Sequence, residues 1–107
     1  MPGSEGESLV QIQVTARHCE LSANTRAFVQ QRLEKLNKYD DGIHDVRVFV
    51  TLERKLHTVE ITLRAHGHDV VITESHADSM AALEIAADRL EDRVRHDKEK
   101  RVSAPRR

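Results

Sequence analysis

Three segments of this sequence alternate between apolar and polar residues position by position, which is the pattern of a β-strand with one buried face. They are residues 9–16, 45–53 and 57–65, and a fourth apolar stretch spans residues 69–74. Such alternation predicts a sheet that is covered on one side only. The short segments 54–56 and 66–68 are expected to turn the chain between the last three strands, which makes those strands antiparallel.

Two other segments repeat apolar residues every three to four positions, as helices packed on a core do. The first is expected to begin after the N-cap Ser22 and to end near residues 40–42, where Gly42 can adopt a positive φ. The second spans residues 78–100, with Asp78 or Ser79 as its N-cap. The expected core positions are Phe28, Val29, Leu33 and Leu36 in the first helix and Met80, Leu83, Ala87, Leu90 and Val94 in the second. We expect the second stripe to cover the sheet rather than to pair two chains in a coiled coil.

The order of these elements is β-α-β-β-β-α. A right-handed crossover should make the first two strands parallel and place the first helix on the apolar face of the sheet, which the second helix also needs. The predicted fold is therefore α+β, a four-stranded mixed sheet with two helices packed on one face. We expect one domain over residues 9–101, a disordered acidic tail over 1–8, and a flexible basic tail or the start of a linker over 102–107.

The composition limits the setting in which the protein works. Cys19 is the only cysteine among the 107 residues, so an internal disulfide is excluded and a reducing compartment is favoured. The start of the chain lacks the basic and apolar regions of a signal peptide, and no apolar run approaches the roughly 20 residues that cross a bilayer. The sequence predicts a soluble, cytoplasmic and monomeric domain without a membrane partner.

The charge is unevenly distributed along the chain. The net charge is −1, yet residues 89–107 contain eight Lys or Arg against four acidic residues, a local charge of +4. A basic helix and tail of this kind favour an anionic partner such as RNA. A solvated charged face without a partner is the alternative interpretation.

The other chemical motifs are weak. The seven histidines include His66 and His68 at a turn, which offer at most two ligands of a metal site, so a polar surface turn is the preferred interpretation. Cys19 beside His18 is interpreted as a small packing or loop residue rather than a reactive thiol. The sequence contains no phosphate-binding glycine loop, nucleophile elbow or metal-hydrolase motif. We therefore expect no enzyme activity, no cofactor, no metal and no small-molecule substrate.

Several short segments together resemble a known family, the ribosome hibernation-promoting factors and ribosome-associated translation inhibitors of bacteria and plastids. The resemblance covers about residues 10–100. It rests on short segments in a fixed order and spacing, namely residues 20–22 leading into 25–29, residues 35–39, residues 50–54, the turn 66–68 and residues 78–84. This chain departs from the family pattern at three positions. It has Met80 where the family often has an aromatic residue and Asp92 where the family usually has an Arg, and Asp97 interrupts the basic tail. The resemblance implies a β-α-β-β-β-α fold similar to double-stranded-RNA-binding domains.

The resemblance also implies a function and a set of RNA-facing residues. A member of this family would bind ribosomal RNA in the decoding channel of the small ribosomal subunit, across the messenger and transfer RNA sites, and stop translation in stressed or stationary cells. The positions carried over from the family are Arg17, Arg26, Lys35, Lys38, Arg54, Arg89, Lys98 and Lys100. Arg93, Arg95 and Arg101 join this set because of their charge and expected exposure.

Two questions stay open in the sequence. The family has also been described as modulating a transcription sigma factor, so a protein-interaction module is an alternative function, and a general double-stranded-RNA binder is another. The chain also fits either a short family member or the N-terminal domain of a longer one.

Overall fold

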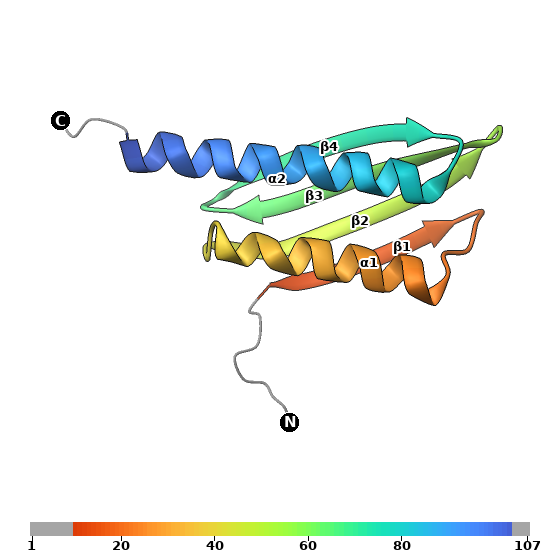
Figure 1. The fold of residues 1–107 in the computed structure, drawn as a ribbon, viewed down its shortest axis with the longest axis horizontal. Helices are drawn as coiled ribbons and strands as arrows, with labels where there is room; N and C mark the ends of the chain where they lie inside the picture. Colours follow the sequence, from red (N-terminus) through yellow and green to blue (C-terminus); the bar gives the residue numbers. More distant parts are fainter. Residues whose placement is uncertain (1–9, 104–107) are drawn as a thin grey trace, which may run out of the picture.

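The computed structural model describes residues 10–103, with side chains described as far as Glu99. The elements follow one another as β1 (Gln11–Arg17), α1 (Ala23–Glu34), the short 3-10 helix η1 (Lys35–Lys38), β2 (Ile43–Glu53), β3 (Leu56–Ala65), β4 (His68–His76) and α2 (Ser79–Ser103) (Figure 1). None of the helices within residues 10–103 combines the length and the apolar character that a bilayer span requires.

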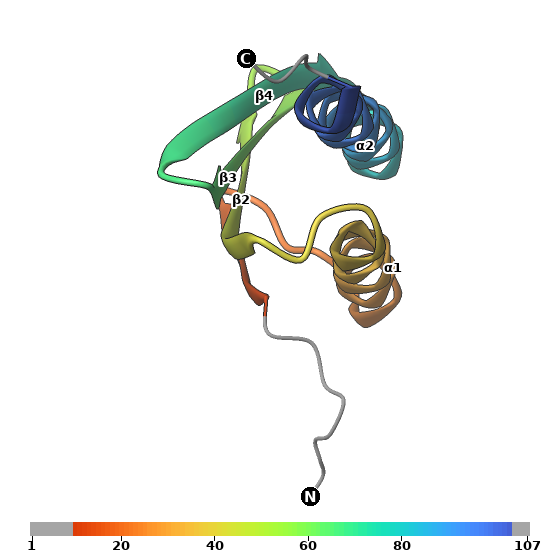
Figure 2. The ribbon, with the colours of Figure 1, turned by 90° about the vertical axis from the view of Figure 1, so that its left-hand side faces the viewer.

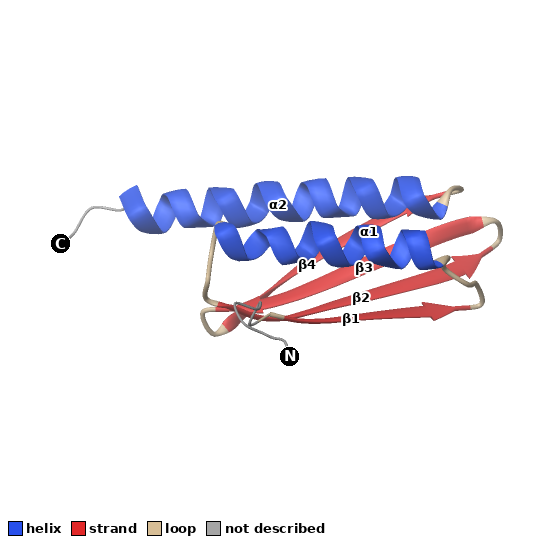
Figure 3. Ribbon diagram, turned by 60° about the horizontal axis from the view of Figure 1, so that its bottom comes forward, coloured by secondary structure: helices blue, strands red, loops and turns tan. Residues whose placement is uncertain are grey.

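The four strands of this region form one mixed sheet in the order β1-β2-β3-β4. β1 is parallel to β2, and the other neighbouring strands are antiparallel. Both α-helices lie on the same face of the sheet, side by side, and leave the opposite face uncovered (Figure 2, Figure 3). The structure confirms the predicted fold class and the predicted parallel pairing of the first two strands.

The core lies between the helices and the inner face of the sheet. Val46, Val48, Val50 and Val59 on this face have no exposed surface. The predicted stripe of α2 is confirmed from Leu83 onward, while Met80 is only half-buried. Three of the four expected core positions of the first helix are buried as well, and Phe28 is half-buried at the edge. Further core residues are Ala82 and Ala86, whose small side chains allow α2 to lie close to the sheet.

Both α-helices begin at the caps that the sequence predicted. The Ser22 hydroxyl accepts a hydrogen bond from the Thr25 backbone N–H at 3.1 Å. The Asp78 carboxylate accepts one from the Ala81 N–H at 3.0 Å, so Asp78 rather than Ser79 caps α2. These bonds satisfy N–H groups that have no partner inside the helix.

Both hairpins have two-residue turns, shorter than expected. Arg54 and Lys55 have φ values of 51° and 67°, and His66 and Gly67 have 55° and 82°. Leu56 and His68 already belong to the following strands. Positive φ at both central residues suits the right-handed twist of the strands, and three of these four positions are occupied by residues other than glycine.

The expectation of a positive φ at Gly42 was wrong, because Gly67 is the only glycine in the described region with that conformation. The chain needs glycine at position 42 for a different reason. A Cβ atom there would lie 2.4 Å from the imidazole of His66, which folds over the backbone at this point. Gly42 therefore permits a close approach rather than a left-handed turn.

Several boundaries differ from the prediction. β1 begins at Gln11 and ends at Arg17, and β2 and β4 are each longer than the alternation indicated. α2 continues through Ser103, so residues 102 and 103 are helical rather than part of a flexible tail. No proline or glycine occurs between residue 79 and Pro105, so the sequence offers no reason for the helix to stop at residue 100. The tails expected over 1–8 and 104–107 lie outside the described residues.

Candidate nucleic-acid interface

The cations without an ion-pair partner among residues 10–99 gather at two ends of the domain. At one end, η1 contributes Lys35 and Lys38, and α2 contributes Lys98. We call these three residues the lysine junction. All three are exposed. Lys38 and Lys98 line the same surface hollow of about 210 Å³, together with Tyr39, Asp40 and Asp41, so the two elements bring lysines to one place, beside two acids.

The opposite end is the tip of the β2–β3 hairpin. Arg54 and Lys55 form the turn itself and are exposed to solvent. Arg17 stands at the end of β1 and is paired in register with Thr51, and its guanidinium lies 6.0 Å from the centre of the Phe49 ring. β2 has 11 residues, so the hairpin tip lies on the order of 30 Å from the lysine junction.

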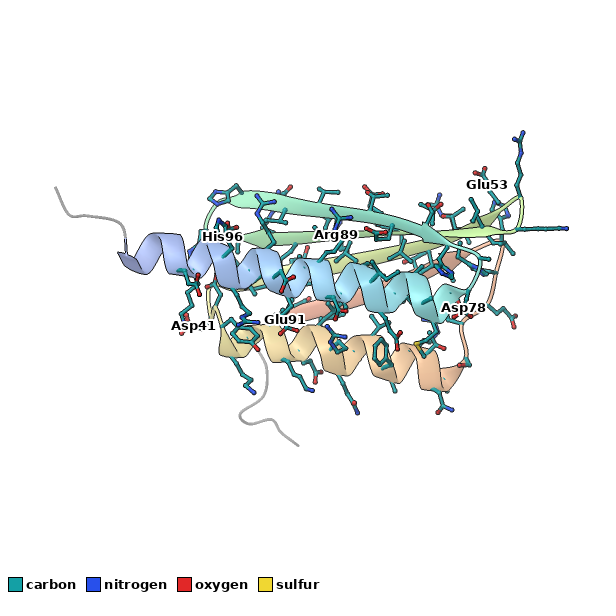
Figure 4. All side chains as sticks on the ribbon, turned by 45° about the horizontal axis from the view of Figure 1, so that its top comes forward. Asp41, Glu53, Asp78, Arg89, Glu91 and His96 are labelled. Carbon is teal, nitrogen blue, oxygen red and sulfur yellow. The ribbon has the colours of Figure 1, made fainter. Side chains whose placement is uncertain are left out.

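The described arginines of α2 differ from the lysines, because each of them faces a carboxylate. We call Arg89, Arg93 and Arg95 the paired arginine row. Arg89 forms an ion pair with Glu74 of β4, Arg93 with Asp97 at 3.2 Å, and Arg95 with Glu91 at 4.0 Å. Figure 4 shows Arg89 and Glu91 on different sides of α2, toward β4 and toward α1 respectively. These pairs reduce the positive field that α2 presents to solvent.

Glu91 is the centre of a polar network between the two helices. It accepts hydrogen bonds from Arg32 at 3.4 Å and from the Tyr39 hydroxyl at 3.2 Å. Arg32 also donates to Asp88 at 2.7 Å and retains only 20% side-chain exposure. The Arg95 guanidinium lies 5.6 Å from the centre of the Tyr39 ring. This network fixes η1 against α2 and thereby holds the lysine junction together.

Two of the predicted RNA-facing arginines contact the outer strands of the sheet. Arg26 of α1 donates to the Val14 carbonyl of β1 at 3.4 Å. Arg89 of α2 donates to the Thr73 carbonyl of β4 at 3.2 Å. Each helix thus places one arginine against a backbone carbonyl of the outer strand beside it.

Lys100 and Arg101 belong to α2, but their side chains lie outside the described part of the structure. Their assignment to the interface stays a prediction. The sequence did not indicate Arg32, Tyr39 or Lys55. Lys55 was detectable from its place beside Arg54, whereas the roles of Arg32 and Tyr39 depend on a helix more than 50 residues away in the chain.

The turn that contains His66 is held in place by a contact with Asp40. The His66 Nε2 lies 2.9 and 3.0 Å from the two carboxylate oxygens of the buried Asp40, which also accepts the Gly42 N–H at 2.9 Å. The described residues contain no group of three or more His, Cys, Asp or Glu side chains placed to hold a metal ion. Cys19 is half-buried against the core, with its Sγ 3.9 Å from the Val50 carbonyl, as expected for a packing residue.

The α+β fold of this chain is also found in two solved structures. The N-terminal domain of Protein Y from Thermus thermophilus superposes with a TM-score of 0.73 and 32% identity, covering 80% of this chain and 97% of that one. A ribosomal subunit interface protein from Coxiella burnetii has a TM-score of 0.76 at 17% identity, covering 84% and 99%, and supports the fold alone.

Residues 12–102 match the family described as Sigma 54 modulation protein / S30EA ribosomal protein, and the chain belongs to this family. It is 31% identical over 94 residues to the ribosome hibernation promoting factor of Pseudomonas putida, covering 88% of this chain and 92% of that protein. The ribosome hibernation promoting factor of Escherichia coli K12 is 29% identical over 91 residues, covering 85% and 96%. The promotion factor of Deinococcus radiodurans is 33% identical, and the match spans 46% of its length.

Proposed function

We propose that this protein binds the small ribosomal subunit and holds ribosomes in an inactive, hibernating state by occupying the decoding channel. The observation that carries the proposal is the match of nearly the whole domain to ribosome hibernation promoting factors. The sites of messenger and transfer RNA would be blocked by the bulk of the protein. Its action is steric and electrostatic, without chemistry on a substrate.

The separation of the two cationic ends supports this mechanism. Phosphate groups are contacted by positioned Arg and Lys side chains, and these contacts fix the orientation of a protein without reading bases. Two contact regions on the order of 30 Å apart on one rigid sheet would orient the wedge along a channel lined by RNA. The hairpin tip and the lysine junction are the regions with cations free to make such contacts.

The predicted RNA-facing residues differ in how readily they can act. Lys35, Lys38, Lys98 and Arg54 form no ion pair with a described residue, so they can approach phosphate without breaking a pair, although Asp40 and Asp41 line the hollow of Lys38 and Lys98. The paired arginine row must first exchange its carboxylates for phosphates, which reduces the net gain in free energy. We therefore assign the main electrostatic contacts to the lysine junction and the hairpin tip. Arg17 and Arg26 act at the flanks, and Lys100 and Arg101 extend the basic surface along α2.

The domain is proposed to act as one monomeric unit over residues 9–101, in the cytoplasm where ribosomes are found. Its partners would be the small subunit and its ribosomal RNA, with no cofactor.

The test is co-sedimentation of the purified protein with small subunits and with whole ribosomes, at low and at high salt. Bound messenger and transfer RNA should displace the protein, and four or five phosphate contacts should give a log–log salt slope of about −3 to −4. A control with a free RNA duplex separates ribosome binding from general duplex binding.

Binding that persists in high salt, or that messenger and transfer RNA leave unchanged, would contradict occupancy of the channel. An absence of ribosome binding at low salt would give first place to the protein-interaction module, for which a sigma factor is the partner to test. Tight binding to the free duplex alone would favour the general RNA binder.

A further inference from the structure

A cleft of about 290 Å³ opens between α2 and the β3–β4 turn, next to the paired arginine row. It is lined by the apolar side chains of Leu63, Ala65, Val70 and Val94. The polar lining residues, which we call the rim, are Asp40, His66, His68, Arg93 and Asp97. The labelled His96 marks this part of α2 in Figure 4. A site that contacts phosphate alone does not need apolar walls, so the proposed electrostatic contacts leave this cleft unexplained.

The rim is held in place before any ligand arrives. His66 is fixed by its two contacts with the Asp40 carboxylate and by its position over Gly42. Arg93 is fixed through its Nε by the Asp97 carboxylate at 3.2 Å. A preformed cleft avoids part of the ordering cost that binding otherwise requires.

The rim nevertheless keeps free hydrogen-bonding groups. The His68 side chain makes no hydrogen bond or ion pair with another described residue, and it lines the cleft beside His66. Arg93 uses only its Nε in the described contacts, which leaves its two terminal nitrogen atoms as donors. A carboxylate has about four lone-pair positions, so Asp97 can still accept hydrogen bonds.

Apolar walls, a fixed imidazole, a guanidinium and a carboxylate are the groups that receive an unstacked base. Proteins recognise RNA bases that have left the helical stack by packing their faces on aromatic or guanidinium planes and by hydrogen-bonding their edges. A pocket with apolar walls and a few placed polar groups suits one small planar ligand. Arg93 belongs both to the cleft lining and to the proposed RNA-facing residues.

We propose that this cleft receives a single unstacked base of ribosomal RNA that carries an exocyclic amino group, with guanine the best fitted. The Asp97 carboxylate would accept the ring and amino N–H groups of guanine. Arg93 or His68 would donate to its oxygen or to its N7, as in other contacts to guanine. This inference rests on the proposed function, since it adds a base contact to an RNA interface.

The first experiment is an NMR titration of the full chain with guanosine 5′-monophosphate, with uridine 5′-monophosphate as the matched mononucleotide. We expect saturable shifts at Ala65, Val70 and Val94, with binding about fivefold tighter for the guanine nucleotide because one edge contact is lost with uracil. A lack of saturable shifts in the cleft would overturn the proposal. Equal binding of both nucleotides would overturn the assigned class of base.

The second experiment fills the cleft. Ala65→Ile adds a side chain that suits a strand and points into the cleft, while Ala27→Ile adds the same atoms to the exposed face of α1. His68→Ala removes one rim group from an exposed position and tests the proposal even if Ala65→Ile lowers stability. Thermal unfolding of each variant shows whether it folds.

Both cleft variants are expected to weaken binding of the guanine nucleotide and of the small subunit about tenfold, the size of one lost base-stacking contact, while Ala27→Ile changes neither. Unchanged subunit binding by both cleft variants would overturn base insertion and leave the proposed function intact. Nucleotide binding in the cleft without any ribosome binding by the wild-type protein would contradict the proposed function instead, and would keep the cleft as a base site.

Discussion

Lys98 of the lysine junction and the paired arginine row lie on the same helix yet present charge in opposite ways. Lys98 shares a surface hollow with Lys38 and has no described carboxylate partner, whereas Arg93, only five residues earlier, is held by Asp97. A sequence that is basic along α2 therefore does not give a uniformly basic surface. The number of positive residues overstates the number that can bind an anion without first giving up a partner.

The same comparison explains how a chain of net charge −1 could make the RNA contacts proposed above. Surface ion pairs contribute little to stability, about 0–1 kcal/mol each, so the acids of α2 can be exchanged at small cost. The unpaired lysines need no exchange. Affinity should then depend mainly on a few junction and hairpin residues, and the arginine row should adjust it.

The largest expected effect concerns the core beneath α2, which supports both the lysine junction and the paired arginine row. Leu90 of α2 is fully buried, and Leu90→Ala should lower the free energy of unfolding by about 2–5 kcal/mol, because it leaves a cavity under the helix. Urea denaturation measures this loss. Ile85→Ala on the exposed face of the same helix is the control and should change stability by less than about 1 kcal/mol. Equal losses would show that α2 does not pack as described.

The next effect breaks the lysine junction itself. Lys35→Glu combined with Lys98→Glu should weaken small-subunit binding at low salt by about 100-fold, since two phosphate contacts become repulsive. The matched control is Arg47→Glu with Arg64→Glu, the same charge change on the uncovered face of the sheet. Co-sedimentation compares the two. A larger loss in the control pair would place the RNA on the other face and contradict the assignment of the junction.

A smaller effect concerns the network that holds the junction together. Glu91→Gln weakens the acceptor shared by Arg32, Tyr39 and Arg95, and should cost about 1–2 kcal/mol in the free energy of unfolding. Its neighbour Asp92 is exposed and has no described partner, so Asp92→Asn should stay within about 0.5 kcal/mol. Chemical denaturation distinguishes the two variants. Indistinguishable stabilities would show that the contacts at Glu91 contribute nothing measurable.

The smallest effect sharpens the comparison between paired and unpaired cations. Glu74→Gln releases Arg89 and should strengthen ribosome binding about two- to fivefold, with a steeper dependence on salt. Glu84→Gln removes the same negative charge from an exposed position of α2 and serves as the control. Equal gains in both variants would mean that net charge alone matters, and that the Arg89 pair has no particular role.

The fold could be predicted because its information is local. Alternating residues define the strands, and Ser22 and Asp78 cap their helices with their own side chains. The role of Gly42 could not be predicted in this way. Glycine is needed there because the imidazole of His66, which belongs to a turn 24 residues later, lies against the backbone. The end of α1 was misplaced for a related reason, since the last turn tightens into η1 where Tyr39 meets α2.

The candidate site was predictable as a set of residue types and positions, but not as a charge distribution. The positions carried over from the family, from Arg17 to Lys98, are exposed, as an interface requires. Which of them are neutralised depends on carboxylates brought by folding, such as Glu74 from β4 against Arg89. Such pairings connect distant parts of the chain, and residue spacing does not encode them.

The contacts of Arg26 and Arg89 with the outer strands have a consequence for the protein at high concentration. An open sheet edge can add a strand from another molecule, and proteins commonly block this with charged residues. Each arginine donates to a backbone carbonyl of an outer strand and places a charged side chain beside that edge. If RNA draws these arginines away, the bound protein loses this charge while the ribosome covers it, and the free protein keeps a charged group at both edges that disfavours strand addition.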